Sequence, residues 1–254
     1  MNRIDAIAFD LDGTLIASAG GIAHALNAAL ADNGLPAFAL DTVRAWIGDG
    51  PDALIARALD ALRLAGAGEI DADPELAARL RGGFDAATLL DPMVGSAIFD
   101  GIPGVLAELA LQRPLVVVTN KPTPLARAVL KTAELLPFFK AVHGADTLVQ
   151  RKPSPLLLQQ AAERLGLAPQ HLLMVGDAAV DIAAAHAAGC PAAWAGWGYG
   201  HASAQAPSPL WRLAAPHELL RHLALPAGAD TEHRTTDPRR QSCPPQESSR
   251  SPSS

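Results

Sequence analysis

The sequence predicts an α/β fold with a parallel sheet as its core and a helical segment inserted into it. Two observations lead to this prediction. Short apolar runs rich in branched residues alternate with amphipathic helical patterns along much of the chain, whereas roughly residues 20–90, within a helical insert expected over residues 18–95, show helical periodicity with few strand candidates. Strands that alternate with helices at this spacing favour a Rossmann-like parallel sheet that helices cover on both faces.

Four segments are predicted as buried strands because they are short, apolar and rich in branched residues: residues 4–9, 115–118, 172–175 and 192–195. A weaker candidate covers residues 141–143. The helices between the later strands each begin at a capping residue or a first-turn proline, or end at glycine. They are expected over residues 125–136, 156–165 and 182–188.

The inserted segment divides the chain into the expected domains. Its helices are predicted over residues 22–30, 42–47, 53–64 and 75–89, with glycine and proline between them. Hinges are expected near residues 17–21 and 91–95, which leaves residues 1–17 and 96–225 as the α/β core. Residues 226–254 have almost no large apolar side chain and are predicted to be a disordered tail, since they cannot bury enough surface to offset the entropy of ordering.

Composition excludes several classes of function. The chain has 254 residues, 49% of them hydrophobic, and a net charge of −6, so it offers no basic excess for nucleic acid. We find no apolar segment long enough to span a bilayer and no secretory signal, so the cytoplasm is the expected compartment. The two cysteines, Cys190 and Cys243, are too few for a disulfide framework or a thiolate metal site.

Two carboxylates end the first predicted strand. Asp10 and Asp12 are separated by one residue and followed by Gly13. Side chains at positions i and i+2 of a strand point the same way, so both acids can converge on one spot, where a cation relieves their repulsion. The alternative is a strand-ending turn whose acids are solvated.

Three more strand or helix ends carry polar side chains. Thr119 and Asn120 end the second strand, Lys152 precedes a helix, and Asp177 and Asp181 lie four residues apart where a strand passes into a helix. Each has a plain alternative: a polar loop, a solvated lysine, or acids that only cap a helix. An open parallel sheet, however, places its ligand site beyond the carboxyl ends of its strands. Together the motifs predict an oxygen-rich site for a hard cation such as Mg²⁺.

The order of these motifs resembles the haloacid dehalogenase superfamily of phosphohydrolases. The resemblance covers roughly residues 4–225 and rests on Asp-Leu-Asp-Gly-Thr at 10–14, Thr-Asn at 119–120, Lys-Pro at 152–153 and Gly-Asp at 176–177, with Asp181. The helical insert resembles the mobile cap of that family. Within it, the chain is most similar to phosphoglycolate phosphatase-like members, through residues 119–122, 151–153 and the insert segments 47–50 and 56–59.

The resemblance implies a division of labour at the site. Asp10 is expected to be the nucleophile that forms an aspartyl-phosphate, and Asp12 the general acid and base. Mg²⁺ is expected to be held by Asp10, the backbone carbonyl of Asp12, and Asp177. The phosphoryl group is expected to be bound by Thr119, the Asn120 backbone and Lys152, while Asp181 orients the metal shell or Lys152.

The leading substrate is a small phosphorylated acid such as 2-phosphoglycolate. Gly48, Gly50 and Arg57 are the candidates for the substrate-facing part of the insert, although Arg57 can equally be solvated or bound within the insert. A sugar phosphate, a nucleotide or pyrophosphate is the alternative within the same fold. From other classes, a receiver-type switch with a phosphorylated aspartate and a catalytically silent binding protein stay open.

Overall fold

The structure is a computed structural model that describes residues 3–66, 73, 75–200 and 207–224. The predicted tail, residues 226–254, lies outside this part. Among the helices that the structure describes, none combines the length and the apolar character that a membrane crossing needs.

A six-stranded parallel sheet forms the centre of the α/β core, as predicted. Its strand order is β5-β4-β1-β6-β7-β8. The strands are β1 (Ala6–Phe9), β4 (Leu115–Thr119), β5 (Phe139–Gly144), β6 (Leu172–Gly176), β7 (Ala192–Ala195) and β8 (Trp211–Leu213). Strand β1 lies between β4 and β6 and pairs in parallel with both. The strand that carries Asp10 is therefore central, with the other motif strands as its neighbours.

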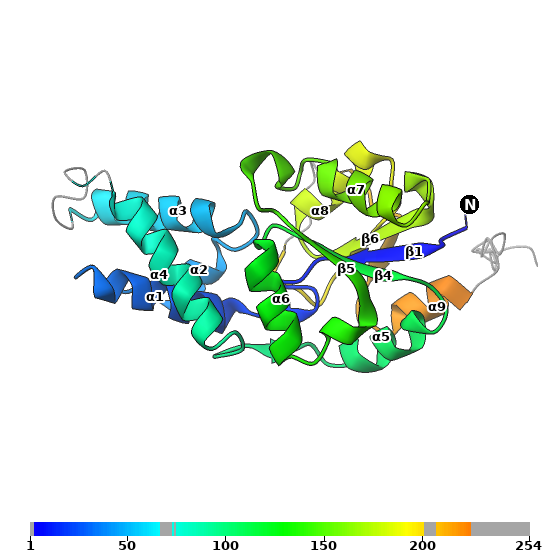
Figure 1. The fold of residues 1–254 in the computed structure, drawn as a ribbon, viewed down its shortest axis with the longest axis horizontal. Coiled ribbons are helices and arrows are strands. Elements are labelled where there is room, and N and C mark those ends of the chain that lie inside the picture. Colours follow the sequence, from blue (N-terminus) through cyan, green and yellow to red (C-terminus); the bar gives the residue numbers. More distant parts are fainter. Residues whose placement is uncertain (1–2, 67–72, 74, 201–206, 225–254) are drawn as a thin grey trace, which may run out of the picture.

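Alternation along β1 sorts its side chains onto two hydrophobic layers. Ile7 and Phe9 face a layer that includes residues of α5 (Ile102–Ala110), α6 (Thr123–Thr132) and α9 (Glu218–Ala224). Ala6 and Ala8 face the other layer, under α7 (Leu156–Arg164) and α8 (Ala179–Ala188). Figure 1 shows these helices on the two faces of the sheet. Burial on both faces explains why the motif strands are almost wholly apolar.

The helical insert has a hydrophobic core of its own. It consists of α1 (Ala19–Asp32), α2 (Leu40–Arg44), α3 (Pro51–Leu64) and α4 (Leu76–Leu90), which lie beside the sheet in Figure 1. A short antiparallel pair, β2 (Ile16–Ala17) and β3 (Ala97–Ile98), joins the two connections to the core. We call residues 18–95 the cap. The division of the chain at these residues stays a prediction.

Two predicted helices end earlier than their periodicity indicated. The helix expected over residues 125–136 ends at Thr132, because Glu134 takes a left-handed backbone with φ of 58°. The N–H of Leu135 then donates to the carbonyl of Leu130 at 2.9 Å, which closes a Schellman-type end. The helix expected over residues 42–47 ends at Arg44 in a turn, where Trp46 N–H donates to Val43 O. Because apolar side chains continue past both ends, the periodicity of the sequence could not locate them.

Two leucines at α5 test the packing of the core. Leu106 is fully buried in the layer beneath the sheet, whereas Leu111, just after the helix, is 89% exposed. We expect Leu106→Ala to lower the free energy of unfolding by about 2–5 kcal/mol through lost burial and a cavity. Leu111→Ala, the matched control, should change it by less than about 0.5 kcal/mol. Urea unfolding of both variants measures the difference, and equal losses would contradict this packing.

Candidate active site

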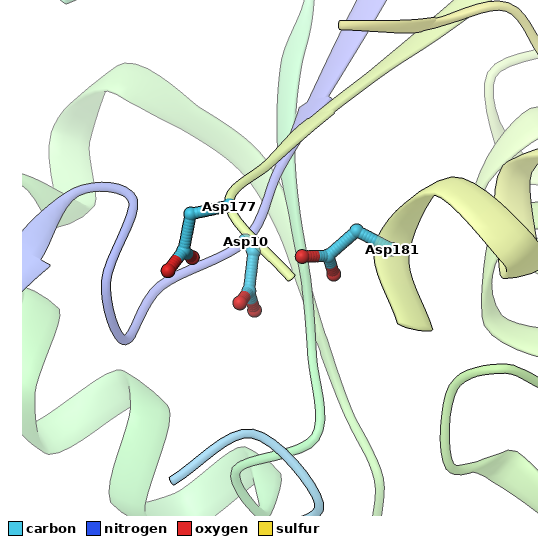
Figure 2. A group of neighbouring side chains, drawn as sticks. All are labelled: Asp10, Asp177 and Asp181. Carbon is cyan, nitrogen blue, oxygen red and sulfur yellow. The ribbon is translucent and has the colours of Figure 1, made fainter. Parts of the chain in front are cut away.

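Three carboxylates meet beyond the carboxyl ends of β1 and β6. Asp10 directly follows β1, Asp177 directly follows β6, and Asp181 lies in the first turn of α8. Each offers an oxygen atom, and these atoms all lie within 4.8 Å of one another (Figure 2). Parallel strands end at the same edge of a sheet, so residues far apart in the sequence converge here.

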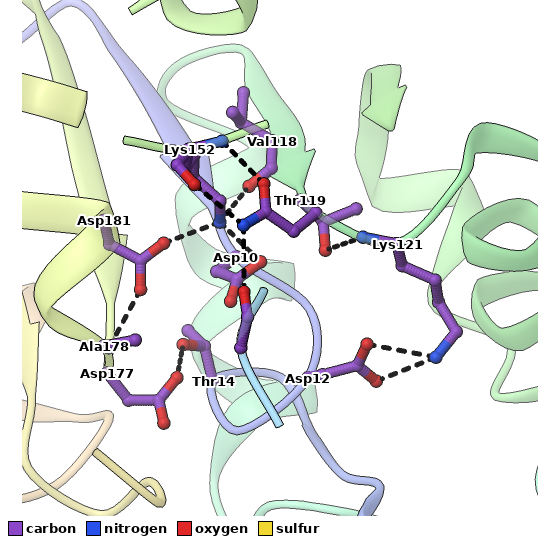
Figure 3. A network of polar contacts seen from close by, with 12 residues as sticks. Asp10, Asp12, Thr14, Val118, Thr119, Lys121, Lys152, Asp177, Ala178 and Asp181 are labelled. Atoms are coloured by element: carbon purple, nitrogen blue, oxygen red, sulfur yellow. Dashed lines mark hydrogen bonds and ion pairs between the residues drawn. The ribbon is translucent and has the colours of Figure 1, made fainter. Parts of the chain in front are cut away.

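Lys152 lies between two of these carboxylates. Its Nζ atom is 2.8 Å from Asp10 Oδ1 and 2.6 Å from Asp181 Oδ1, and it donates to the Val118 carbonyl at 3.0 Å (Figure 3). Its side chain is almost completely buried. Burial opposes the charge, but the negative charges of Asp10 and Asp181 outweigh it and raise the pKa of Lys152. The lysine is therefore a fixed cation at the site.

The cluster carries more negative than positive charge. Three carboxylates around one ammonium leave a formal charge of −2. Burial, with help from Asp181 and Asp12, raises the pKa of Asp10 to about 6 although Lys152 opposes this. Burial and the negative charge of Asp10 raise the pKa of Asp177 to about 6 as well. A bound divalent cation would balance this charge, and carboxylate oxygens are the ligands that Mg²⁺ prefers.

Asp177 is held in place by three donors. Thr14 Oγ1 donates to its Oδ1 at 2.9 Å, and the backbone N–H groups of Tyr199 and Gly200 donate to its Oδ2 at 2.8 and 3.2 Å. Gly13, with φ of +89°, passes so close that a side chain there would collide with the Asp177 carboxylate. Among the described residues, Asp177 has no lysine or arginine within ion-pair distance, which leaves its charge available to a metal ion.

The oxygens of Asp181 are both occupied by protein donors. Lys152 binds Oδ1, and the backbone N–H of Ala178 donates to Oδ2 at 2.9 Å. Its side chain is fully buried. Asp181 therefore contacts Lys152, one of the two groups that it is expected to orient, and its orienting role stays a prediction.

Asp12 is paired with a lysine to which the sequence analysis gave no role. Lys121 Nζ is 3.0 and 3.1 Å from the two carboxylate oxygens of Asp12, and the lysine is 7% exposed (Figure 3). Its position after Thr119 and Asn120 at a strand end was the available signal, but lysines in such loops are usually solvated. Thr14 and Tyr199 were also missed as partners of Asp177, since nothing in a single sequence links residues so far apart.

Asn120 ties the loops of the site together. Its side-chain amide donates to the carbonyls of Gly48 in the cap, at 2.9 Å, and Lys152, at 3.1 Å. Its Oδ1 accepts from the backbone N–H of Lys152 at 2.7 Å. Thr119 Oγ1 accepts from the backbone N–H of Lys121 at 3.2 Å. The side chain of Asn120 therefore holds the loop of Lys152 and links it to the cap at Gly48.

A pocket opens between the core and the cap. Its core side is lined by Asp10, Asp12, Thr119, Asn120 and Lys121. Its cap side includes Gly48 and Gly50, two of the candidates for the substrate-facing part, and six apolar residues: Ile22, Trp46, Ile47, Pro51, Leu54 and Phe84. Arg57 does not line the pocket. Its guanidinium donates to the Trp46 carbonyl at 2.6 Å and pairs with Asp49, so it is bound within the cap.

Comparisons with known proteins indicate the same family as the motifs. The family model of the haloacid dehalogenase-like hydrolases matches residues 4–189. The chain is 39% identical to the phosphoglycolate phosphatase of Yersinia pseudotuberculosis over 231 residues, covering 90% of this chain and 97% of that protein. It is 38% identical to the Escherichia coli K12 phosphoglycolate phosphatase over 219 residues, which cover 80% and 87% of the two chains.

A solved structure of a similar protein has the same fold. The crystal structure of a predicted phosphoglycolate phosphatase from Haemophilus somnus superposes with a TM-score of 0.79 at 31% identity, covering 87% of this chain and 99% of that one. The predictions of the fold and of a phosphoric monoester hydrolase that resembles phosphoglycolate phosphatases are confirmed. The chain belongs to the haloacid dehalogenase-like hydrolases.

Proposed function

We propose that this enzyme is a magnesium-dependent phosphatase that hydrolyses a small phosphate monoester, with 2-phosphoglycolate as the leading substrate. One observation carries the proposal: Asp10, Asp12 and Thr119 line one pocket, and Asp10 lies within 4.8 Å of a carboxylate oxygen of Asp177 and 2.8 Å from Lys152 Nζ. The names of the relatives, phosphoglycolate phosphatases at 38–39% identity, support the choice of substrate.

Asp10 and Asp12 have separate tasks in the proposed reaction. A carboxylate oxygen of Asp10 attacks phosphorus, and the bond between phosphorus and the ester oxygen breaks. Protonated Asp12 gives its proton to the departing oxygen, so an alcohol leaves and an aspartyl-phosphate remains. Water then attacks that phosphorus and passes a proton to Asp12. The bond to Asp10 breaks, inorganic phosphate leaves, and both aspartates return to their starting states.

The remaining residues hold the phosphoryl group and the metal. Lys152, Thr119 and the Asn120 backbone bind the phosphoryl oxygens, with Asp181 positioning Lys152 through their 2.6 Å contact. Asp10, Asp177 and the backbone carbonyl of Asp12 hold Mg²⁺. When bound, the ion neutralises the repulsion between Asp10 and the phosphate and orients the transferred group.

The cap side of the pocket favours a small substrate over a sugar phosphate or a nucleotide. Its six apolar side chains offer few partners for sugar hydroxyls, which lose hydrogen bonds to water when they are buried. A two-carbon leaving group has no sugar hydroxyls to bury against these walls, and its one carboxylate needs a single cationic partner. The same walls exclude water while the phosphoryl group is transferred.

A panel of phosphate monoesters tests the substrate. We expect kcat/KM for 2-phosphoglycolate to exceed that for glucose 6-phosphate, a nucleoside monophosphate and pyrophosphate by about tenfold or more, because the leaving group must fit the pocket. Phosphate release under identical conditions measures this. Faster hydrolysis of any of those three than of 2-phosphoglycolate would overturn the substrate assignment.

Leaving-group dependence tests the role of Asp12. The Asp12→Asn variant cannot protonate the departing oxygen, so we expect it to lose about 10²- to 10⁴-fold in the rate of phosphoryl transfer from 2-phosphoglycolate. Transfer from 4-nitrophenyl phosphate, whose leaving group needs no proton, should fall far less. Rapid-mixing measurement of the first turnover separates transfer from the later hydrolysis. Equal losses on both substrates would show that Asp12 is not the general acid.

The pH dependence of stability tests the metal site without measuring activity. The pKa of Asp177 in the metal-free fold, about 6, lies above its ordinary value of 3.8. Its contribution to stability is therefore present below pH 4 and is lost as pH rises through 6. Mg²⁺ must displace this proton, so its stabilisation of the fold should grow as pH rises from 5 to 7. Thermal unfolding with Mg²⁺ or EDTA measures both effects.

Asp177→Asn is the control for this experiment. The variant lacks the titrating carboxylate, so Mg²⁺ should raise its melting temperature much less than that of the wild type at pH 7. An undiminished magnesium shift in Asp177→Asn, or one in the wild type that is the same at pH 5 and pH 7, would contradict the metal site.

A further inference from the structure

Lys121 lies on the wall of the pocket and supplies its positive charge. Among the described residues that line the pocket, it is the only one with a cationic side chain. The arginines nearby are engaged elsewhere: Arg57 pairs with Asp49, and Arg151 pairs with Asp52. Lys152 is paired with Asp10 and Asp181 and is not among the described residues that line the pocket.

The amino group of Lys121 has a donor to spare. An ammonium carries three N–H donors, and the two oxygens of Asp12 account for two of them. The side chain is 6% exposed, so its charge is held in surroundings where a further anion is bound more strongly than in water. The other walls of the pocket on the cap side are apolar and offer an anionic group no competing cation.

The position of Lys121 relative to Asp12 determines which part of a substrate Lys121 can contact. Asp10, which lines the pocket and contacts Lys152, marks the proposed phosphoryl end, and Asp12 is the proposed partner of the ester oxygen. Lys121 contacts Asp12 from the side away from Lys152 (Figure 3). A group attached one or two bonds beyond the ester oxygen therefore lies within its reach.

We infer that Lys121 is a specificity-determining residue that binds a carboxylate of the leaving group, using the N–H that Asp12 leaves free. This deepens the proposed function and rests on it. Lys121 then selects phosphate esters that carry a carboxylate next to the ester carbon, and it joins the substrate to the general acid through one ammonium. Esters of the same size without that charge gain nothing from Lys121.

Two substrates of equal length separate this role from others. We compare 2-phosphoglycolate with 2-hydroxyethyl phosphate, in which a hydroxymethyl group replaces the carboxylate. Lys121→Met keeps the length of the side chain and removes its charge. We expect its kcat/KM for 2-phosphoglycolate to fall by roughly 10- to 100-fold more than that for 2-hydroxyethyl phosphate. Lys121→Arg should retain most of the preference, and Lys131→Met, at an exposed lysine of α6, should retain all of it.

Binding measurements in Asp12 variants separate the contact of Lys121 with the substrate from its effect on Asp12. Lys121→Met leaves the Asp12 carboxylate without its partner, which can unfold the chain. A double variant that replaces both Asp12 and Lys121 avoids this unpaired charge. In Asp12→Asn, calorimetry with Mg²⁺ should still show tighter binding of 2-phosphoglycolate than of 2-hydroxyethyl phosphate. In Asp12→Asn/Lys121→Met, that preference should be lost.

The outcomes are distinct. Equal losses on both substrates in Lys121→Met would mean that Lys121 acts only through Asp12, and an unchanged preference would mean that it does not contact the leaving group. Either result overturns the inference while the proposed function stands. A wild-type enzyme that does not prefer 2-phosphoglycolate over 2-hydroxyethyl phosphate would overturn the proposed substrate itself.

Discussion

The repulsion among the buried carboxylates of Asp10, Asp177 and Asp181 is the constraint on which the rest of the site depends. A single ammonium, that of Lys152, lies among them, and it leaves a formal charge of −2 that protonation of a carboxylate or a bound cation must reduce. Such an arrangement is costly for folding alone. The fold maintains it by placing the three residues at the ends of β1 and β6 and the start of α8, and by aiming three donors at Asp177.

The cap forms the second side of the pocket that Asp10 and Asp12 line. It covers the pocket with apolar side chains, and polar contacts close to the proposed catalytic residues join it to the core. Asn120 reaches from the loop after β4 to the Gly48 carbonyl, while Arg151, next to Lys152, pairs with Asp52 at the start of α3. Because the same short loops hold the proposed phosphoryl-binding residues and contact the cap, the arrangement of the cap and the geometry of the site are coupled.

Much of the core could be predicted from the sequence because a parallel sheet buried on both faces needs nearly continuous apolar runs. The strands at 115–118, 172–175 and 192–195 lie within a residue of their observed bounds for this reason. The edge strand β8 was missed, since Trp211–Leu213 is short and includes the exposed Arg212. The left-handed Glu134 that ends α6 left no signal either, because glycine or asparagine normally takes that conformation.

Some residues of the site could be predicted from the sequence, and others could not. Asp10, Asp12, Lys152 and Asp177 stand out because acids and a lysine at strand and helix ends are costly without a ligand. Lys121 did not stand out, because its burial against Asp12 depends on how two loops from different strands meet.

A crystal structure of the enzyme with Mn²⁺ and a non-hydrolysable phosphate analogue tests the central claim most directly. Anomalous scattering should place one ion at coordination distance from carboxylate oxygens of both Asp10 and Asp177. An ion bound by only one of them, or no ion at this edge of the sheet at saturating Mn²⁺, would contradict it.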